Sequence, residues 1–165
     1  MRTALALAAL ALSSAAQAQD GRVWSVQAVK GEPALLAYAA PDSEDLGVSL
    51  SCPRGTGQIT VTSAIERRLA DHLRGETWVD KLGHPAPWPA RVALSSGAAS
   101  ATLRGQANPD EMNGGSTLTT EVSSAAPVIK AFRKTGVLKV AALGETLAPP
   151  AAATRMVRTF LGACR

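Results

Sequence analysis

Short segments in which apolar and polar residues alternate recur along this chain, and they constrain its fold more than any other feature. Their apolar positions are Trp24 and Val26, Val48 and Leu50, Ile59 and Val61, Val92 and Leu94, Ala101 and Leu103, and Leu118 and Val122. A period of two predicts strands that bury only one face. Glycines and prolines separate these segments. The sequence therefore predicts a mainly β fold, an antiparallel β-sandwich or a sandwich-like barrel.

Three segments have helical periodicity instead. Residues 63–75 begin with a Ser-Ala-Ile-Glu capping box and carry apolar residues at every fourth position, although a strand and turn remain an alternative there. Residues 125–134 have a proline in the first turn and a glycine past the end. Residues 151–164 carry an apolar stripe that includes Phe160 and Cys164. We expect two or three short helices, including a C-terminal one.

Two segments rich in proline or glycine interrupt this pattern. The alternating prolines of Pro85–Pro89 remove backbone donors, which argues against a central strand. Trp88, between two of them, is either a plug over the core, the interpretation we favour, or an exposed anchor for a partner. Residues 106–115 contain Asn-Pro-Asp and Asn-Gly-Gly and are predicted to form a long mobile loop.

The first 18 residues have the layout of a secretory signal peptide. A short basic start precedes the apolar run from Ala4 to Leu12, which is too short to span a bilayer, and Ala16 and Ala18 are the small residues that signal peptidase requires. We expect residues 1–18 to be removed, no membrane span afterwards, and a periplasmic or secreted location. Residues 19–165 would then form a single domain with its own core.

The chain has two cysteines, Cys52 and Cys164, and both lie in the expected mature region. An oxidising compartment and an even number of cysteines predict a disulfide between them. This disulfide would join the end of an early strand to the terminal helix. Metal ligation and a reactive thiol are the disfavoured alternatives, because neither cysteine has another Cys or a His at ligand spacing.

The whole chain has a net charge of +4, and its basic residues concentrate in the last part of the sequence. This pattern is typical of a solvated basic face, and its alternative interpretation is a surface for an acidic partner. The aromatic residues do not interleave with the bases, and a periplasmic compartment lacks nucleic acid, so we expect no nucleic-acid partner. The candidate partner-binding residues are Trp88, His84, Lys130, Arg133 and Lys134.

No catalytic motif, cofactor motif or metal-ligand cluster is evident in the sequence. None of the serines lies in a Gly-x-Ser-x-Gly or Ser-x-x-Lys motif. Asp71 precedes His72, but neighbouring side chains diverge on a helix, so the two are predicted to be a poor acid–base pair. A small envelope hydrolase that uses His84 or His72 as its base is an alternative function, and it needs a nucleophile brought close by the fold.

The order of several segments resembles that of two groups of exported proteins. These segments are Trp24, a strand ending at Cys52, a strand over residues 135–139 after a short helix, and a terminal helix ending at Cys164. They resemble small exported proteobacterial proteins of unassigned function. The layout is also similar to the sheet module of type VI secretion-associated periplasmic accessory proteins, over about residues 22–165. The resemblance implies a β-rich fold and an accessory role in the envelope.

These observations favour a non-enzymatic periplasmic binding or accessory module for another envelope protein. An inhibitor of a cell-wall lytic enzyme is a further alternative. The basic last part of the chain argues against it, because many lytic enzymes are themselves basic and would be repelled.

Overall fold

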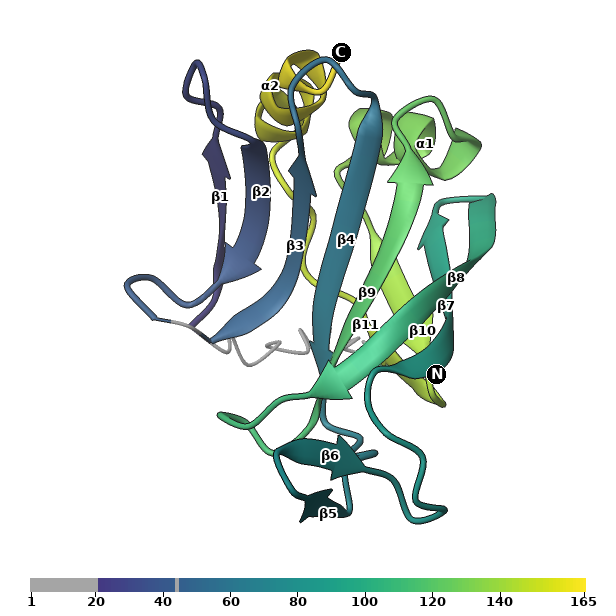
Figure 1. The fold of residues 1–165 in the computed structure, drawn as a ribbon. Coiled ribbons are helices and arrows are strands. Elements are labelled where there is room, and N and C mark those ends of the chain that lie inside the picture. Colours follow the sequence, from purple (N-terminus) through teal and green to yellow (C-terminus); the bar gives the residue numbers. More distant parts are fainter. Residues whose placement is uncertain (1–20, 44) are drawn as a thin grey trace, which may run out of the picture.

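Nine strands form one antiparallel sheet that curls into a half-barrel (Figure 1). The computed structural model describes residues 21–43 and 45–165, so the predicted signal peptide lies outside the described residues. The strand order is β1-β2-β3-β4-β9-β8-β7-β10-β11, and β5 and β6 form a separate hairpin. The predicted mainly β, antiparallel fold is confirmed. The strands are β1 Val23–Gln27, β2 Ala34–Ala39, β3 Leu46–Cys52, β4 Gln58–Ile65, β5 His72–Arg74, β6 Thr77–Val79, β7 Trp88–Ser96, β8 Ala99–Pro109, β9 Ser116–Ser123, β10 Lys139–Ala142 and β11 Glu145–Leu147.

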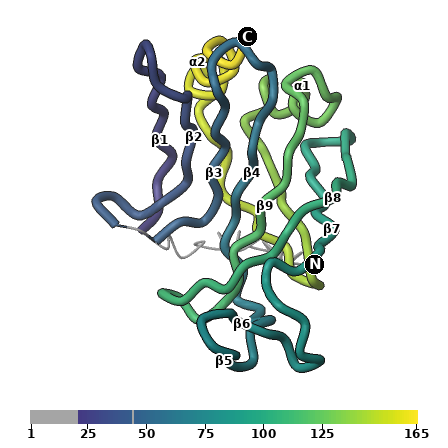
Figure 2. Tube along the Cα trace, in the orientation of Figure 1, coloured from purple at the N-terminus to yellow at the C-terminus, as the bar shows by residue number. Residues whose placement is uncertain are grey.

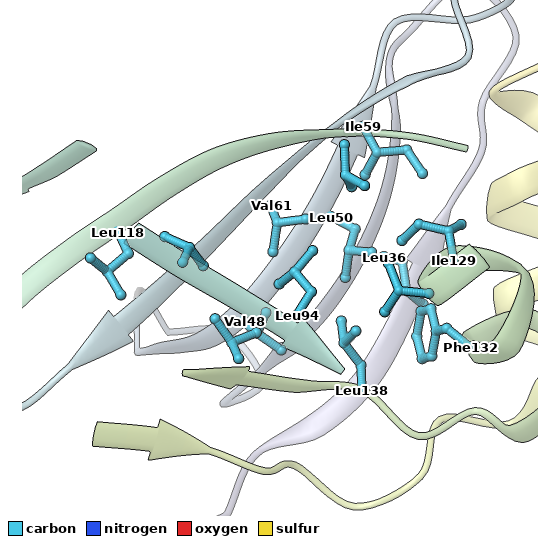
Figure 3. Close-up of a cluster of buried hydrophobic side chains, with 14 of the residues drawn as sticks. Leu36, Val48, Leu50, Ile59, Val61, Leu94, Leu118, Ile129, Phe132 and Leu138 are labelled. Atoms are coloured by element: carbon cyan, nitrogen blue, oxygen red, sulfur yellow. The ribbon is translucent and has the colours of Figure 1, made fainter. Parts of the chain in front are cut away.

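The core lies on one face of this sheet, where the alternating apolar residues meet (Figure 3). Leu36, Val48, Leu50 and Leu94 are fully buried there. Their neighbours along the strands point to the other face, because successive side chains of a strand alternate. The alternation predicted from the sequence therefore corresponds to the buried and exposed faces of a single curled sheet.

Two helices pack together and cover one end of the half-barrel, at the top of Figure 1. They are α1 Pro127–Thr135 and α2 Thr154–Ala163. Phe132 of α1 and Phe160 of α2 are fully buried, whereas Met156 is only half-buried. None of the described helices is long and apolar enough to cross a membrane.

The predicted helix over residues 151–164 exists but begins later, at Thr154. The residues before it connect to α1 instead, because the N–H of Ala152 donates a hydrogen bond to the carbonyl of Gly136 (2.8 Å). Gly136 ends α1 with a φ of +70°, a backbone conformation that favours glycine. This connection holds the start of α2 against the end of α1.

A disulfide joins Cys52, the last residue of β3, to Cys164 at the end of α2, with the two Cα atoms 5.7 Å apart. Both cysteines are fully buried, so the disulfide belongs to the core. The N–H of Gly57 donates a hydrogen bond to the carbonyl of Cys164 (2.7 Å) and attaches the same helix end to the β3–β4 turn. The predicted pairing is confirmed.

The helix predicted over residues 63–75 is wrong, and the strand-and-turn alternative is correct. Ser63 lies in β4, where it pairs with Val48 on one side and Leu118 on the other. Its backbone is therefore committed to two neighbouring strands and cannot begin a helix. Gly75 lies in the turn between β5 and β6 with a φ of +66°.

The proline-rich segment 85–89 and the glycine-rich segment 106–115 also differ from the predictions. Trp88 and Pro89 begin β7, which lies inside the sheet between β8 and β10. Proline is tolerated there because β10 pairs only with residues 93–95, so the start of β7 has no ladder partner on that side. The predicted long loop is a turn of residues 110–115, because β8 runs on to Pro109 between β7 and β9.

Candidate binding site

A lobe projects from the end of the half-barrel opposite the helices, at the bottom of Figure 1. It consists of residues 66–87, which leave β4, form the β5–β6 hairpin and enter β7, as the chain trace in Figure 2 shows. Backbone hydrogen bonds hold it together: the N–H of Asp71 donates to the carbonyl of Val79 (2.8 Å), and the N–H of Ala86 donates to the carbonyl of Trp78 (2.9 Å). The lobe thus consists of a short hairpin and one returning segment.

Asp80 organises the returning segment. Its carboxylate accepts hydrogen bonds from the N–H groups of Leu82 and His84, both at 2.9 Å, and lies 3.2 Å from Nδ1 of His84. Partial desolvation acts to raise the pKa of Asp80, but the hydrogen bonds from His84 and Leu82 and the attraction of the imidazole together hold it below its usual 3.8. Asp80 is therefore an ionised anchor that sets the position of the His84 ring.

The lobe carries two exposed His–Asp pairs. Nδ1 of His72 lies 3.0 Å from a carboxylate oxygen of Asp71, and Nδ1 of His84 lies 3.2 Å from that of Asp80. The predicted poor geometry of the first pair is wrong, because His72 lies on a strand and not on a helix. In both pairs the carboxylate orients the imidazole, as a general base requires. Among the described residues no hydroxyl is hydrogen-bonded to either ring.

A half-buried tryptophan joins the lobe to the adjoining turn, residues 110–115. Nε1 of Trp78 donates a hydrogen bond to Glu111 (2.6 Å), and the Arg68 guanidinium lies 5.7 Å from the centre of the Trp78 ring. A cation at that distance is attracted by the face of the ring. These residues line a cavity of about 290 Å³ between the lobe and the turn. The contacts keep the two segments together as one surface.

Large apolar side chains are exposed on this surface. Leu73 is 51% exposed, Leu82 is 80% exposed, and Met112 of the adjoining turn is 73% exposed. They are three of the five large apolar residues recorded as exposed in the described part of the chain. Leu73 is directly opposite Trp78 in the hairpin, so the two side chains share a face. Three exposed large apolar residues on the lobe and its adjoining turn favour an interaction surface at this end of the molecule.

A second cavity of about 670 Å³ opens near β3, β4 and β11. Two of its charged side chains are engaged by other parts of the protein. Arg22 is ion-paired with Asp45 (2.5 Å), and a carboxylate oxygen of Glu145 accepts a hydrogen bond from the N–H of Glu66 (3.0 Å). These charges stabilise the open edges of the sheet, so the cavity is a weaker candidate than the lobe.

Comparison with protein-family models, curated proteins and solved structures finds no match to this chain. The resemblance to type VI secretion-associated accessory proteins therefore stays a prediction.

The structure divides the predicted partner-binding residues between two ends of the molecule. His84 belongs to the lobe, and Trp88 lies just behind it, only 5% exposed, with Nε1 donating to the carbonyl of His84 (3.0 Å). The predicted plug is confirmed, so the Trp88 side chain supports the lobe from the core. Lys130, Arg133 and Lys134 are exposed on α1, at the opposite end.

Sequence reasoning missed the apolar surface of the lobe. Leu73 falls in the predicted helix over residues 63–75, where its spacing implies that it is buried. The signal was present in Leu82 and Met112, which are isolated large apolar residues between glycines and charged residues. The described residues contain no group of three or more metal-ligating side chains close enough to hold an ion.

Proposed function

We propose that this protein is a non-enzymatic binding module that docks another protein of the bacterial envelope through the lobe. The observation that carries the proposal is the exposure of Leu73 and Leu82 on the lobe and of Met112 on the adjoining turn. Burying such side chains against a partner releases about 25 cal/mol for each Å² of apolar area. The Trp78 contacts with Arg68 and Glu111 support it further, because they hold the surface in place before a partner arrives.

A periplasmic location forms part of this proposal. The Cys52–Cys164 disulfide supports it, because structural disulfides form and persist in oxidising compartments. The signal-peptide pattern of residues 1–18 and the resemblance to envelope accessory proteins support the same location. The partner is therefore sought among envelope proteins.

Crosslinking in the periplasm tests the proposal. A photoreactive residue at Leu82 should capture a discrete partner, whereas the same residue at Val29 should capture none, because Val29 is comparably apolar and 57% exposed but lies outside the lobe. Replacing Leu73 and Met112 by serine should abolish the capture without lowering the melting temperature, since exposed changes seldom alter stability. Equal capture from Leu82 and Val29, or capture that survives the serine variant, would refute the lobe as the docking surface.

A second candidate function, a small envelope hydrolase, draws on the two His–Asp pairs at 3.0 and 3.2 Å. Replacing His72 and His84 by glutamine distinguishes the two functions. A binding module should still capture its partner, whereas a hydrolase should lose its activity on envelope material.

A further inference from the structure

Two arginines face each other across the β7–β8 hairpin. Arg91 and Arg104 are directly opposite in the antiparallel register, so their side chains leave the sheet on the same face. Both are exposed, and the core lies on the other face of the sheet. Like charges directly opposite on neighbouring strands destabilise a sheet. This placement therefore costs stability unless an anion lies between the two side chains.

No acidic side chain of the described chain neutralises either arginine. The ion pairs among the described residues involve Arg22, His72 and His84, and neither Arg91 nor Arg104 forms one. Glu121 continues the β8–β9 register opposite Arg104 on the exposed face, yet the two side chains form no ion pair. Neither guanidinium group therefore lies within ion-pair distance of a carboxylate among the described residues.

The arginines also line a groove of about 500 Å³. Gln106 adds a side-chain amide, which supplies two further donors, and Pro89 lies directly opposite Gln106 on β7. Pro87 and Pro89 form an apolar wall that restricts the backbone beside the charged groups. The groove thus combines two positive charges, amide donors and a rigid wall on one side.

We propose that this groove binds a doubly charged phosphoryl group, as found in a phosphomonoester. Directly opposite residues have Cβ atoms only about 5 Å apart, so both guanidinium groups reach one small ligand. Arginine binds phosphate through paired, charge-assisted hydrogen bonds. A phosphoryl dianion neutralises both arginines, whereas a single carboxylate neutralises one. The site involves none of the exposed residues Leu73, Leu82 and Met112, so it does not depend on the proposed docking function.

Titration of the mature protein with inorganic phosphate, followed by amide NMR shifts, tests the site. Saturable shifts are expected at Arg91, Arg104 and Gln106. Arg91→Gln and Arg104→Gln should each weaken binding about tenfold or more, the loss expected for one charge-assisted interaction. Arg155→Gln and Arg158→Gln remove the same charge from the exposed face of α2 and should leave the affinity unchanged.

Two further measurements identify the source of the phosphoryl group and test whether the two arginines repel each other. Binding to phosphatidic acid vesicles with the same arginine dependence would identify a lipid headgroup as the source, and binding to glycerol phosphate alone would identify a soluble ester. Without phosphate, Arg91→Gln should raise the melting temperature, because it removes a like-charge contact. The absence of saturable shifts, equal weakening in the α2 variants, or equal affinity for acetate would overturn the proposal.

Discussion

Removing the Cys52–Cys164 disulfide is the sharpest test of how this fold is held together. The two cysteines are 112 residues apart, so the bond closes most of the described chain into one loop. In the chain-entropy model, a loop of that length stabilises the native state by about 5 kcal/mol relative to the open chain. A double Cys→Ala variant loses this restriction of the unfolded state and also two buried sulfur atoms.

The expected result is a large fall in melting temperature. For a domain of this size, each kcal/mol corresponds to roughly 2–4 °C, so a loss of about 5 kcal/mol lowers the melting temperature by roughly 10–20 °C. α2 should loosen first, because without the disulfide Cys164 is held mainly by the hydrogen bond from Gly57 and by the burial of Val157, Phe160 and Leu161.

Differential scanning calorimetry of the mature protein measures this change. Wild-type protein with a reductant should melt near the double variant, and the reductant should have no effect on the variant itself. Mass spectrometry without reduction should show no free thiol in the wild type. A melting temperature of the variant within about 2 °C of the wild type would refute the reasoning, since it corresponds to 1 kcal/mol or less.

Two further predictions concern single positions. Gly136→Ala should cost at least twice the stability that Gly97→Ala costs, because an added Cβ at Gly136 would lie 2.0 Å from the Ala152 carbonyl oxygen, whereas at Gly97 it would meet nothing within 4 Å. Both glycines have positive φ, so Gly97→Ala measures the backbone strain alone, about 1–2 kcal/mol. Equal losses of stability in urea unfolding would contradict the packing argument. Asp80→Asn should destabilise the lobe at neutral pH but not at about pH 2, because the pKa of Asp80 is lowered in the folded state. The stabilisation by the carboxylate is present above the usual pKa of 3.8 and is lost as the pH falls through the lowered value. Amide hydrogen exchange at His84 measures this change, and an effect of the substitution that is independent of pH would contradict the prediction.

The candidate site could be predicted only in part, for reasons that lie in particular residues. His84 is a candidate residue from the sequence, but its contact with Asp80 depends on how the chain turns between the two residues. Leu73 lies four residues after Leu69, which is helical spacing. The same spacing is also compatible with a turn followed by a strand, so it does not decide between the two structures. Arg91 and Arg104 are 13 positions apart, and only the hairpin register places them opposite each other.

The sequence by itself determined the β class, the buried face of the strands with alternating residues and the amphipathic terminal helix. Each of these depends on the periodicity of residues that are close in the chain, and side-chain direction follows backbone conformation directly. It also determined the disulfide, since two cysteines allow one intramolecular pairing. The tertiary structure alone decided the strand order, the fate of residues 63–75 and the meeting of Arg91 with Arg104. These depend on hydrogen bonds between distant segments, as at Ser63, where pairing with β3 and β9 overrides the local helical signal.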